Sequence, residues 1–189
     1  MRFNIRLVLF TLFLVAITVT CKYFFGPNLE MSGFSPILAI AVFSGMIVFR
    51  KDYSFLLPLV ALLASDAVIE VLHRQGLFDY AGFYKGQWVN YLLLLLTAII
   101  GWTIKGNKLG NLFTNALVAP TVYFLISNTI VWAGVKEAPY TNDFSGWLTC
   151  INAGLPFYKN SLIATAIFLP AIALVYNAMV VRKWKVVVG

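Results

Sequence analysis

The residues most able to do chemistry lie in one stretch of otherwise apolar sequence. Asp66, Glu70 and His73 fall at positions i, i+4 and i+7, so a helix would present all three on one face. A carboxylate there costs about 3 kcal/mol to insert into a membrane and normally faces a bundle interior or a water-filled cavity. The spacing therefore predicts the wall of a polar pocket. Two alternatives stay open: Asp66 satisfied by Asn128 or by neighbouring hydroxyl groups, and Glu70 paired with Arg74.

The same residue types can also ligate a metal or exchange protons. The chain contains a single His and no second cluster of ligating residues is evident, so we expect neither a metal site nor a cofactor. Asp66 and His73 are an acid–base pair by type, but they lie two helical turns apart, about 10 Å along the axis. No Ser or Cys nucleophile is obviously paired with them, and we expect a protein that is not an enzyme.

Composition indicates what kind of molecule carries these residues. Of the 189 residues, 61% are hydrophobic and 11% are charged, and the mean hydropathy is +0.86. Soluble domains contain about 45–50% apolar and about 25% charged residues. This difference excludes an ordinary soluble protein, a disordered tail and a nucleic-acid-binding domain, although the net charge is +7. We expect an integral membrane protein whose partners include the lipid bilayer but no nucleic acid.

Apolar stretches predict an all-α bundle of six transmembrane helices that forms one domain, residues 1–189. A bilayer core about 30 Å thick needs about 20 apolar residues in a helix, fewer where aromatic residues lie at the interface. The predicted spans are 7–21, 34–49, 53–72, 88–104, 112–132 and 161–181. The first span could instead be a cleaved signal peptide, but no small-x-small cleavage pattern precedes Lys22, so we expect a retained helix.

Basic residues in the connections predict the orientation, because cytoplasmic connections carry an excess of Lys and Arg. With the N-terminus inside, the cytoplasmic side collects Arg2, Arg6, Arg50, Lys51, Lys105, Lys108, Arg182, Lys183 and Lys185. The outer side then holds only Lys22, Arg74, Lys85, Lys136 and Lys159. We therefore expect both termini in the cytoplasm.

The fifth span adds polar and aromatic candidates near the outer surface. Asn128 lies at a depth comparable to that of Asp66. Trp132 ends the same span, where it could close a pocket or serve as an interfacial anchor, the commoner role of a terminal Trp. Both residues are therefore candidates for contact with a bound solute.

The longest outer loop, residues 133–160, has an amphipathic pattern of its own. Asn142 or Asp143 can cap a short helix that begins near Phe144 and ends at Pro156. This helix is expected either as a lid over the outer mouth or as an interfacial helix with aromatic anchors. With the spans, the loop completes the predicted substrate-binding set: Asp66, Glu70, Asn128, Trp132, Trp147, Phe157 and Asn160.

Two further features concern packing. Cys21 and Cys150 both fall on the outer side, where a disulfide is chemically allowed and would tie the long loop to the first span. The alternative is two unrelated buried thiols. Ala41 and Gly45 are small residues four positions apart that allow close helix approach, which we expect to serve packing within the bundle.

Short motifs between residues 34 and 165 carry a family resemblance. They are Ser35-Pro36, Ala39-Ile40-Ala41-Val42-Phe43-Ser44-Gly45, Leu57-Pro58, Ser65-Asp66, Ser127-Asn128, Gly146-Trp147-Leu148-Thr149-Cys150 and Pro156-Phe157. In this order they resemble an uncharacterised family of small bacterial membrane proteins. That family in turn resembles the substrate-binding S components of energy-coupling-factor (ECF) vitamin transporters, which are six-helix proteins that dock on a transmembrane coupling subunit and ATPases. The first span lacks the Ala-x-x-x-Ala motif that S components often use for docking.

The resemblance implies a solute-binding subunit of an ECF-like uptake transporter in the bacterial cytoplasmic (inner) membrane. Its outward-facing pocket would capture a small polar or vitamin-like solute, cationic solutes included, and its protein partners would be a coupling subunit and ATPases. The alternative is a non-catalytic structural or assembly subunit of a larger membrane complex. The small size, the short cytoplasmic connections and the small-residue face of the second span favour that alternative.

Overall fold

The protein is built from helices. The computed structural model describes residues 5–47, 55–105, 108–134 and 140–181, and these residues contain six α-helices and no strand. In chain order the elements are α1 (Ile5–Phe25), the 3₁₀ turn η1 (Leu29–Met31), α2 (Ile37–Ile47), α4 (Leu56–Arg74), α5 (Gln87–Thr103), α6 (Leu109–Gly134), α7 (Phe144–Tyr176) and the π-helical turn η2 (Asn177–Val181). The all-α part of the predicted fold is confirmed.

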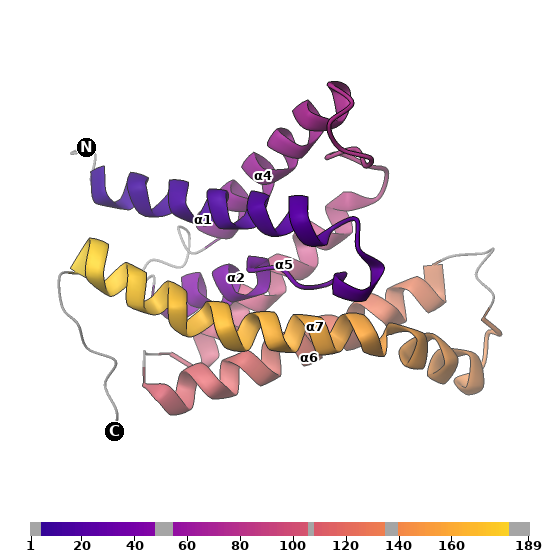
Figure 1. The fold of residues 1–189 in the computed structure, drawn as a ribbon. Coiled ribbons are helices and arrows are strands. Elements are labelled where there is room, and N and C mark those ends of the chain that lie inside the picture. Colours follow the sequence, from indigo (N-terminus) through magenta and orange to yellow (C-terminus); the bar gives the residue numbers. More distant parts are fainter. Residues whose placement is uncertain (1–4, 48–54, 106–107, 135–139, 182–189) are drawn as a thin grey trace.

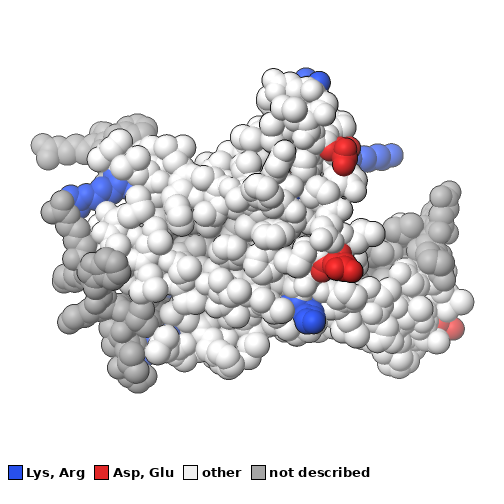
Figure 2. Space-filling view, in the orientation of Figure 1, with Lys and Arg blue, Asp and Glu red and all other residues white. Residues whose placement is uncertain are grey.

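Four of the described helical segments are long and apolar enough to cross a membrane: α1, α4, α6 and the continuous segment Phe144–Val181. The apolar helices α2 and α5 are shorter, at 11 and 17 residues, or about 17 and 26 Å at 1.5 Å per residue. On the face that Figure 2 shows, an uncharged band separates charged side chains at the left from those in the right half. These features are compatible with a membrane protein, and the complete six-span topology stays a prediction.

Each predicted span overlaps one of these helices, and several of the helices extend beyond the predicted limits. The predicted boundary between the second and third spans falls on residues 48–54, which lie outside the described residues. At the other end of the second span, α2 begins at Ile37 rather than at residue 34. The clearest difference concerns α1, which continues to Phe25, so that Lys22 lies in its last turn rather than in a loop.

The first and last described helices meet at one end of the bundle. α1 begins and η2 ends at the left of Figure 1, and the two elements contact each other. The side of the membrane on which this end lies stays a prediction. Of the basic residues that predict it, the following lie outside the described residues: Arg2, Arg50, Lys51, Lys136, Arg182, Lys183 and Lys185.

α2 forms the centre of the bundle. Every residue from Leu38 to Met46 is buried, as expected for a helix that is apolar on all sides. Its closest crossing is with α5, where a Cβ atom on Gly45 would collide with the backbone of Ala98 and Gly101. Gly45 and the fully buried Ala41 therefore serve packing inside the bundle, which supports the interpretation made from the sequence.

The helix predicted in the last outer loop is not a separate element. α7 runs as one helix over Phe144–Tyr176 with Pro156 inside it, so the short helix and the predicted span 161–181 are continuous. The prediction of a short amphipathic helix that ends at Pro156 is therefore wrong. Much of the predicted loop 133–160 is helical, and its residues 135–139 lie outside the described residues.

Packing against α6 explains why α7 continues through a proline. On one side of Pro156, Trp147 Nε1 donates a hydrogen bond to Thr129 Oγ1 of α6 at 3.0 Å. On the other side, the rings of Tyr158 and Phe124 stack with their centroids 4.6 Å apart. Proline removes one backbone hydrogen bond from a helix, and neighbouring helices can offset that loss in a membrane protein. The α6–α7 contact thus specifies a long helix where local sequence favours an end.

Candidate functional site

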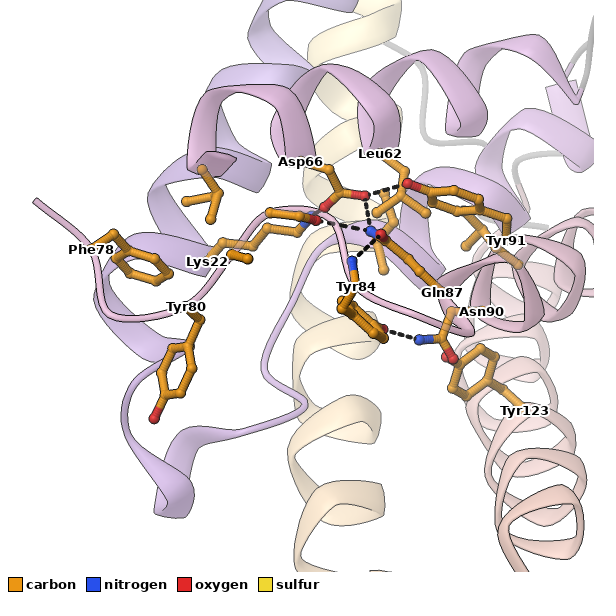
Figure 3. Close-up of a pocket in the computed structure, with 16 residues that line it drawn as sticks. Lys22, Leu62, Asp66, Phe78, Tyr80, Tyr84, Gln87, Asn90, Tyr91 and Tyr123 are labelled. Carbon is orange, nitrogen blue, oxygen red and sulfur yellow. Dashed lines mark hydrogen bonds and ion pairs between the residues drawn. The ribbon is translucent and has the colours of Figure 1, made fainter. Parts of the chain in front are cut away.

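The site is organised around the carboxylate of Asp66 on α4, which is 4% exposed. Its Oδ1 forms an ion pair with Nζ of Lys22 from the last turn of α1. Its Oδ2 accepts hydrogen bonds from Gln87 Nε2 and Tyr91 Oη of α5, each at 2.6 Å (Figure 3). A buried charge is tolerated when it is both paired and hydrogen bonded. Two other helices therefore supply the partners that keep Asp66 inside α4.

Lys22 has a second acceptor in the same network. Its Nζ donates to Ser65 Oγ at 2.8 Å, and Ser65 Oγ donates in turn to the carbonyl oxygen of Leu62 at 2.7 Å. An ammonium group has three N–H donors, and the described residues accept two of them. The Lys22 side chain is also the more accessible of the pair, at 24% exposed against 6% for Asp66.

The segment between α4 and α5 is held against the same face of α4. Glu70 Oε2 accepts a hydrogen bond from the backbone N of Gly82 at 3.1 Å, and His73 Nδ1 is bonded to the backbone O of Phe78 at 2.9 Å. Position 82 must be glycine in this packing, because a Cβ atom there would collide with the Asp66 carbonyl and the Glu70 amide. The polar face predicted on this helix therefore positions the connecting segment.

A cavity of about 310 Å³ lies beside this network. Ligand pockets occupy about 300–1,000 Å³ and are mainly apolar with a few placed polar groups. The walls here are mainly apolar and aromatic, and the charged residues among them are Lys22 and Asp66. Five aromatic rings line the cavity: Phe78, Tyr80, Tyr84, Tyr91 and Tyr123. The volume lies at the lower end of this range, and the walls have the same mixture of apolar and polar groups.

The connecting segment forms one wall and is joined to α5 at the wall itself. Asn90 Nδ2 donates a hydrogen bond to Tyr84 Oη (Figure 3), and the backbone N of Tyr84 donates to Gln87 Oε1 at 3.2 Å. The segment reaches α5 through Gly86, which has φ +86°. That left-handed conformation favours glycine. This segment, rather than the predicted 133–160 loop, carries the cavity wall.

Comparison with known proteins places the chain in a family. Residues 1–187 match the family model described as "Family of unknown function (DUF6580)". The chain belongs to this family. No curated protein and no solved structure matches the chain. The match spans every residue of the cavity wall, while the description assigns no function, so a functional proposal must come from the chemistry of the site.

The structure divides the predicted substrate-binding residues of this DUF6580 member, and Asp66 is the one that lines the cavity. Glu70 forms an ion pair with Arg74 at 2.7 Å, which is the alternative that the sequence left open. Together with its bond to the connecting segment, this makes Glu70 a positioning residue. His73 has a separate backbone partner, and the described residues contain no cluster of three side chains suited to a metal ion.

Three predicted residues lie in a second polar region, at the α6–α7 contact. The Asn128 side chain donates to its own helix, at the carbonyl oxygen of Phe124, at 2.9 Å. Trp132 Nε1 donates to the carbonyl oxygen of Thr141 at 2.9 Å, before α7 begins. Trp147 donates across to α6, as described above. None of these three residues is among those that line the cavity.

The last two predicted residues also lie on α7, away from the cavity walls. Phe157 is 42% exposed. Asn160 Nδ2 donates to the carbonyl oxygens of Glu30 at 2.7 Å and Ser32 at 2.9 Å, so it fixes the connection between α1 and α2 onto α7. The structure thus gives Asn160 a role in tertiary packing.

The two cysteines are separate, buried thiols rather than a disulfide. Cys21 lies on α1, which packs along α4. Cys150 lies on α7 and donates its Sγ to the carbonyl oxygen of Asn128 on α6 at 3.4 Å. The thiols therefore face different partners, which agrees with the interpretation of two unrelated buried thiols.

Several residues of the site were not identified from the sequence: Lys22, Gln87 and Tyr91. One signal was present, because a Lys in the last turn of an apolar helix calls for a counter-charge or for access to the interface. A second signal is the density of aromatic residues just after the third predicted span, including Phe78, Tyr80 and Tyr84. Such density is typical of a ligand wall.

Proposed function

We propose that this chain is a membrane-embedded solute-binding protein that captures a small molecule in the cavity beside Lys22 and Asp66. The observation that carries the proposal is the cavity of about 310 Å³ itself, with mainly apolar walls, five aromatic rings and a single ion pair. Proteins place a few polar groups in such pockets to fix the orientation of a ligand.

The proposed topology has six spans with both termini in the cytoplasm of a bacterium. Lys22 lies in the last turn of α1, Asp66 lies just past the middle of α4, and Gln87 begins α5, so the cavity lies toward one end of the bundle. In the orientation predicted by the basic residues, this end faces away from the cytoplasm. A solute arriving from outside would therefore meet the cavity first.

We further propose that the chain works as the solute-binding subunit of an ECF-like uptake system. The support is the set of motifs that resembles an uncharacterised family of small bacterial membrane proteins, which in turn resembles S components. One of these motifs, Ser65-Asp66, contributes two members of the Lys22 network. The described helices form a compact bundle with short connections, so energy for uptake would come from partner ATPases through a transmembrane coupling subunit.

Binding fits the site better than catalysis does. The cavity walls, in the part of the chain that the structure describes, contain no Ser, Cys or His. The carboxylate of Asp66 already accepts from three donors, which leaves it poorly placed to take a proton from a substrate. We therefore propose no catalytic step and no cofactor.

The test is native mass spectrometry of the full chain, gently extracted from its own membrane. We expect a reproducible added mass of a few hundred daltons on the wild-type protein. Leu62→Trp would fill the cavity and remove this mass, because Leu62 lines the wall. Leu63→Trp is the matched control, since the neighbouring Leu63 is 45% exposed and is not part of the wall.

The outcomes separate two kinds of protein. Loss of the added mass in Leu62→Trp alone, with both variants monodisperse, supports solute binding. Retention of the mass in Leu62→Trp would contradict the assigned cavity. Spectra that show only stoichiometric protein partners would replace the proposal with the structural or assembly subunit that the sequence allowed.

A further inference from the structure

The cavity walls have the chemistry of a site for an aromatic ring. Phe78, Tyr80 and Tyr84 come from the connecting segment, Tyr91 from α5 and Tyr123 from α6. The same cavity is also lined by aliphatic side chains that include Leu62 and Leu94. Aromatic rings stack or meet edge to face with about 0.5–1.5 kcal/mol beyond their burial. A planar aromatic ligand gains this aromatic stacking energy at several walls, whereas a puckered saturated ligand does not.

Protein donors occupy most of the acceptor positions of the carboxylate in the cavity. Asp66 accepts from Lys22, Gln87 and Tyr91 through both of its oxygens, three of about four acceptor positions, and its side chain is 6% exposed. A cationic ligand would have to reach the remaining position, on the oxygen that already pairs with Lys22, or displace one of these donors and leave it buried without a partner. Removing one partner from a buried polar contact is costly. The arrangement therefore disfavours a cation.

Of the two charged groups in the cavity lining, Lys22 is the more accessible to a ligand. Lys22 gives two of its three N–H donors to Asp66 and Ser65, it lines the cavity, and it is 24% exposed. The third donor suits a carbonyl or carboxylate oxygen, and hydrogen bonds from an ionised donor are the stronger kind. A ligand that presents an acceptor beside its ring satisfies both the ammonium and the aromatic walls.

We infer that the cavity binds a planar aromatic molecule that carries no positive charge and presents a carbonyl or carboxylate oxygen to Lys22. This inference rests on the proposed solute-binding function and names its ligand class. It leaves out the cationic solutes that the sequence analysis included, because Asp66 already pairs with Lys22, Gln87 and Tyr91, and Glu70 with Arg74 and the connecting segment.

Four synthetic probes of similar size test the inference by calorimetry on the purified full chain in detergent. 2-Naphthoate and 2-acetylnaphthalene are flat and carry an acceptor. 2-Naphthylmethylamine is flat but cationic, and decahydro-2-naphthoate carries the acceptor on a saturated frame. We expect both flat acceptors to bind, the amine to bind at least about tenfold more weakly because it loses the charge-assisted bond, and the saturated acid to bind several-fold more weakly.

Variants of the cavity residues test whether the preference for flat, uncharged or anionic probes arises in this cavity. Lys22→Gln combined with Asp66→Asn keeps hydrogen-bonding groups while removing both charges, and we expect it to weaken 2-naphthoate binding about tenfold. Lys159→Gln is the control, because Lys159 is an exposed residue of α7. Phe78→Leu should reduce the preference for flat over saturated acid, whereas Phe113→Leu on the exposed surface of α6 should not.

Failure of this inference is distinguishable from failure of the proposed function. The inference is overturned if the amine or the saturated acid binds as tightly as 2-naphthoate, or if no probe binds at millimolar concentration. The solute-binding function still stands if the native protein carries a small molecule that Leu62→Trp removes. Both fall together only when neither a co-purified molecule nor any probe occupies the cavity.

Discussion

Two polar regions of this bundle look alike in sequence and differ in structure. The first surrounds Asp66, whose partners come from α1 and α5 and border a cavity. The second is the α6–α7 contact, where Asn128 bonds its own helix and Trp147 bonds the helix beside it. Both contain polar side chains within apolar helices. The comparison teaches that such a side chain marks an interior contact, and that the region proposed as a binding site also has unfilled space and a donor to spare.

The largest difference between the regions should appear when one polar side chain is removed from each. Asp66→Ala leaves the Lys22 ammonium without its counter-charge, and we expect a loss of about 3 kcal/mol in the free energy of unfolding. Asn128→Ala removes one hydrogen bond and should cost about 1 kcal/mol. Unfolding of each purified variant, measured by circular dichroism in mixed micelles, gives the two values.

A rescue variant controls this first comparison. Lys22→Gln together with Asp66→Asn removes both charges at once, so we expect it to recover most of the stability lost in Asp66→Ala. Equal losses for Asp66→Ala and Asn128→Ala would show that the ion pair is no more important to the fold than the α6 hydrogen bond.

A smaller effect should come from adding a methyl group to each region. Gly82→Ala directs its Cβ into the backbone of α4, which cannot yield, so the connecting segment must move and we expect a loss of about 2 kcal/mol. Gly154→Ala meets the side chains of Asn128 and Phe124, which can shift, and should cost about 1 kcal/mol or less.

Limited proteolysis reads out the first of these two changes directly. Lys85 lies at the end of the connecting segment, so trypsin should cleave after it faster in Gly82→Ala than in Gly154→Ala. Gly76→Ala is an informative third variant, because a Cβ atom there meets open space and only its positive φ causes strain. Equal cleavage in all three would contradict the tight packing assigned to Gly82.

Acid should loosen the α7 end of the second region by a still smaller amount. Hydrogen bonds from the Thr141 hydroxyl and the Gly146 amide hold the pKa of Asp143, the N-cap of α7, below its usual value. A depressed pKa gives stability that is complete above the unfolded value of about 3.9 and is lost as the pH falls through the folded value. We expect the fluorescence of Trp147 to change only below about pH 4.

The pH response has a simple matched variant. Asp143→Asn keeps a side-chain oxygen that can cap the helix but cannot titrate. Its fluorescence should therefore be flat over the same acid range. An unchanged transition in this variant would assign the response to another group.

The last prediction is that reductant has no effect on stability. Because Cys21 and Cys150 are separate thiols, reductant should leave the thermal stability unchanged, and the unfolded chain should take up two maleimide labels without prior reduction. If maleimide labels the unfolded chain only after reduction, the two cysteines form a disulfide. That disulfide would join α1, next to the Asp66 region, to the α6–α7 contact.

The positions of the helices could be predicted more fully than the contacts between them. Apolar runs located every described α-helix, including the 11-residue α2, because a helix satisfies its own backbone hydrogen bonds within one segment and buries apolar side chains against its neighbours. The boundaries were less accurate where tertiary contacts decide them, as at Pro156, which local rules assign to a helix end and which α6 holds inside α7. Gly45 shows the opposite case, since its small size predicted close packing that α5 provides.

The sequence predicted one residue of the site, Asp66, but not the residues that surround it. Asp66 could be identified from the sequence because a carboxylate in an apolar helix is costly unless it faces a polar partner or a cavity. Its partner Lys22 is 44 positions away, and no helical periodicity links residues on different elements. Gln87 and Tyr91 were hidden for the same reason. Glu70 had two local alternatives, and the structure shows that it pairs with Arg74 while it also holds the connecting segment.

The separation of Lys22 and Asp66 along the chain has a consequence for biosynthesis. Ribosomes add about 5–20 residues per second, so the separation of 44 positions takes between about 2 and 9 seconds to synthesise. In the proposed topology, the first helix would spend that interval in the bilayer with an unmatched ammonium near its end. A long flexible stem lets a lysine keep its charge at the headgroup level. Lys22 would therefore act first as a temporary anchor and turn inward when α4 arrives with its acid.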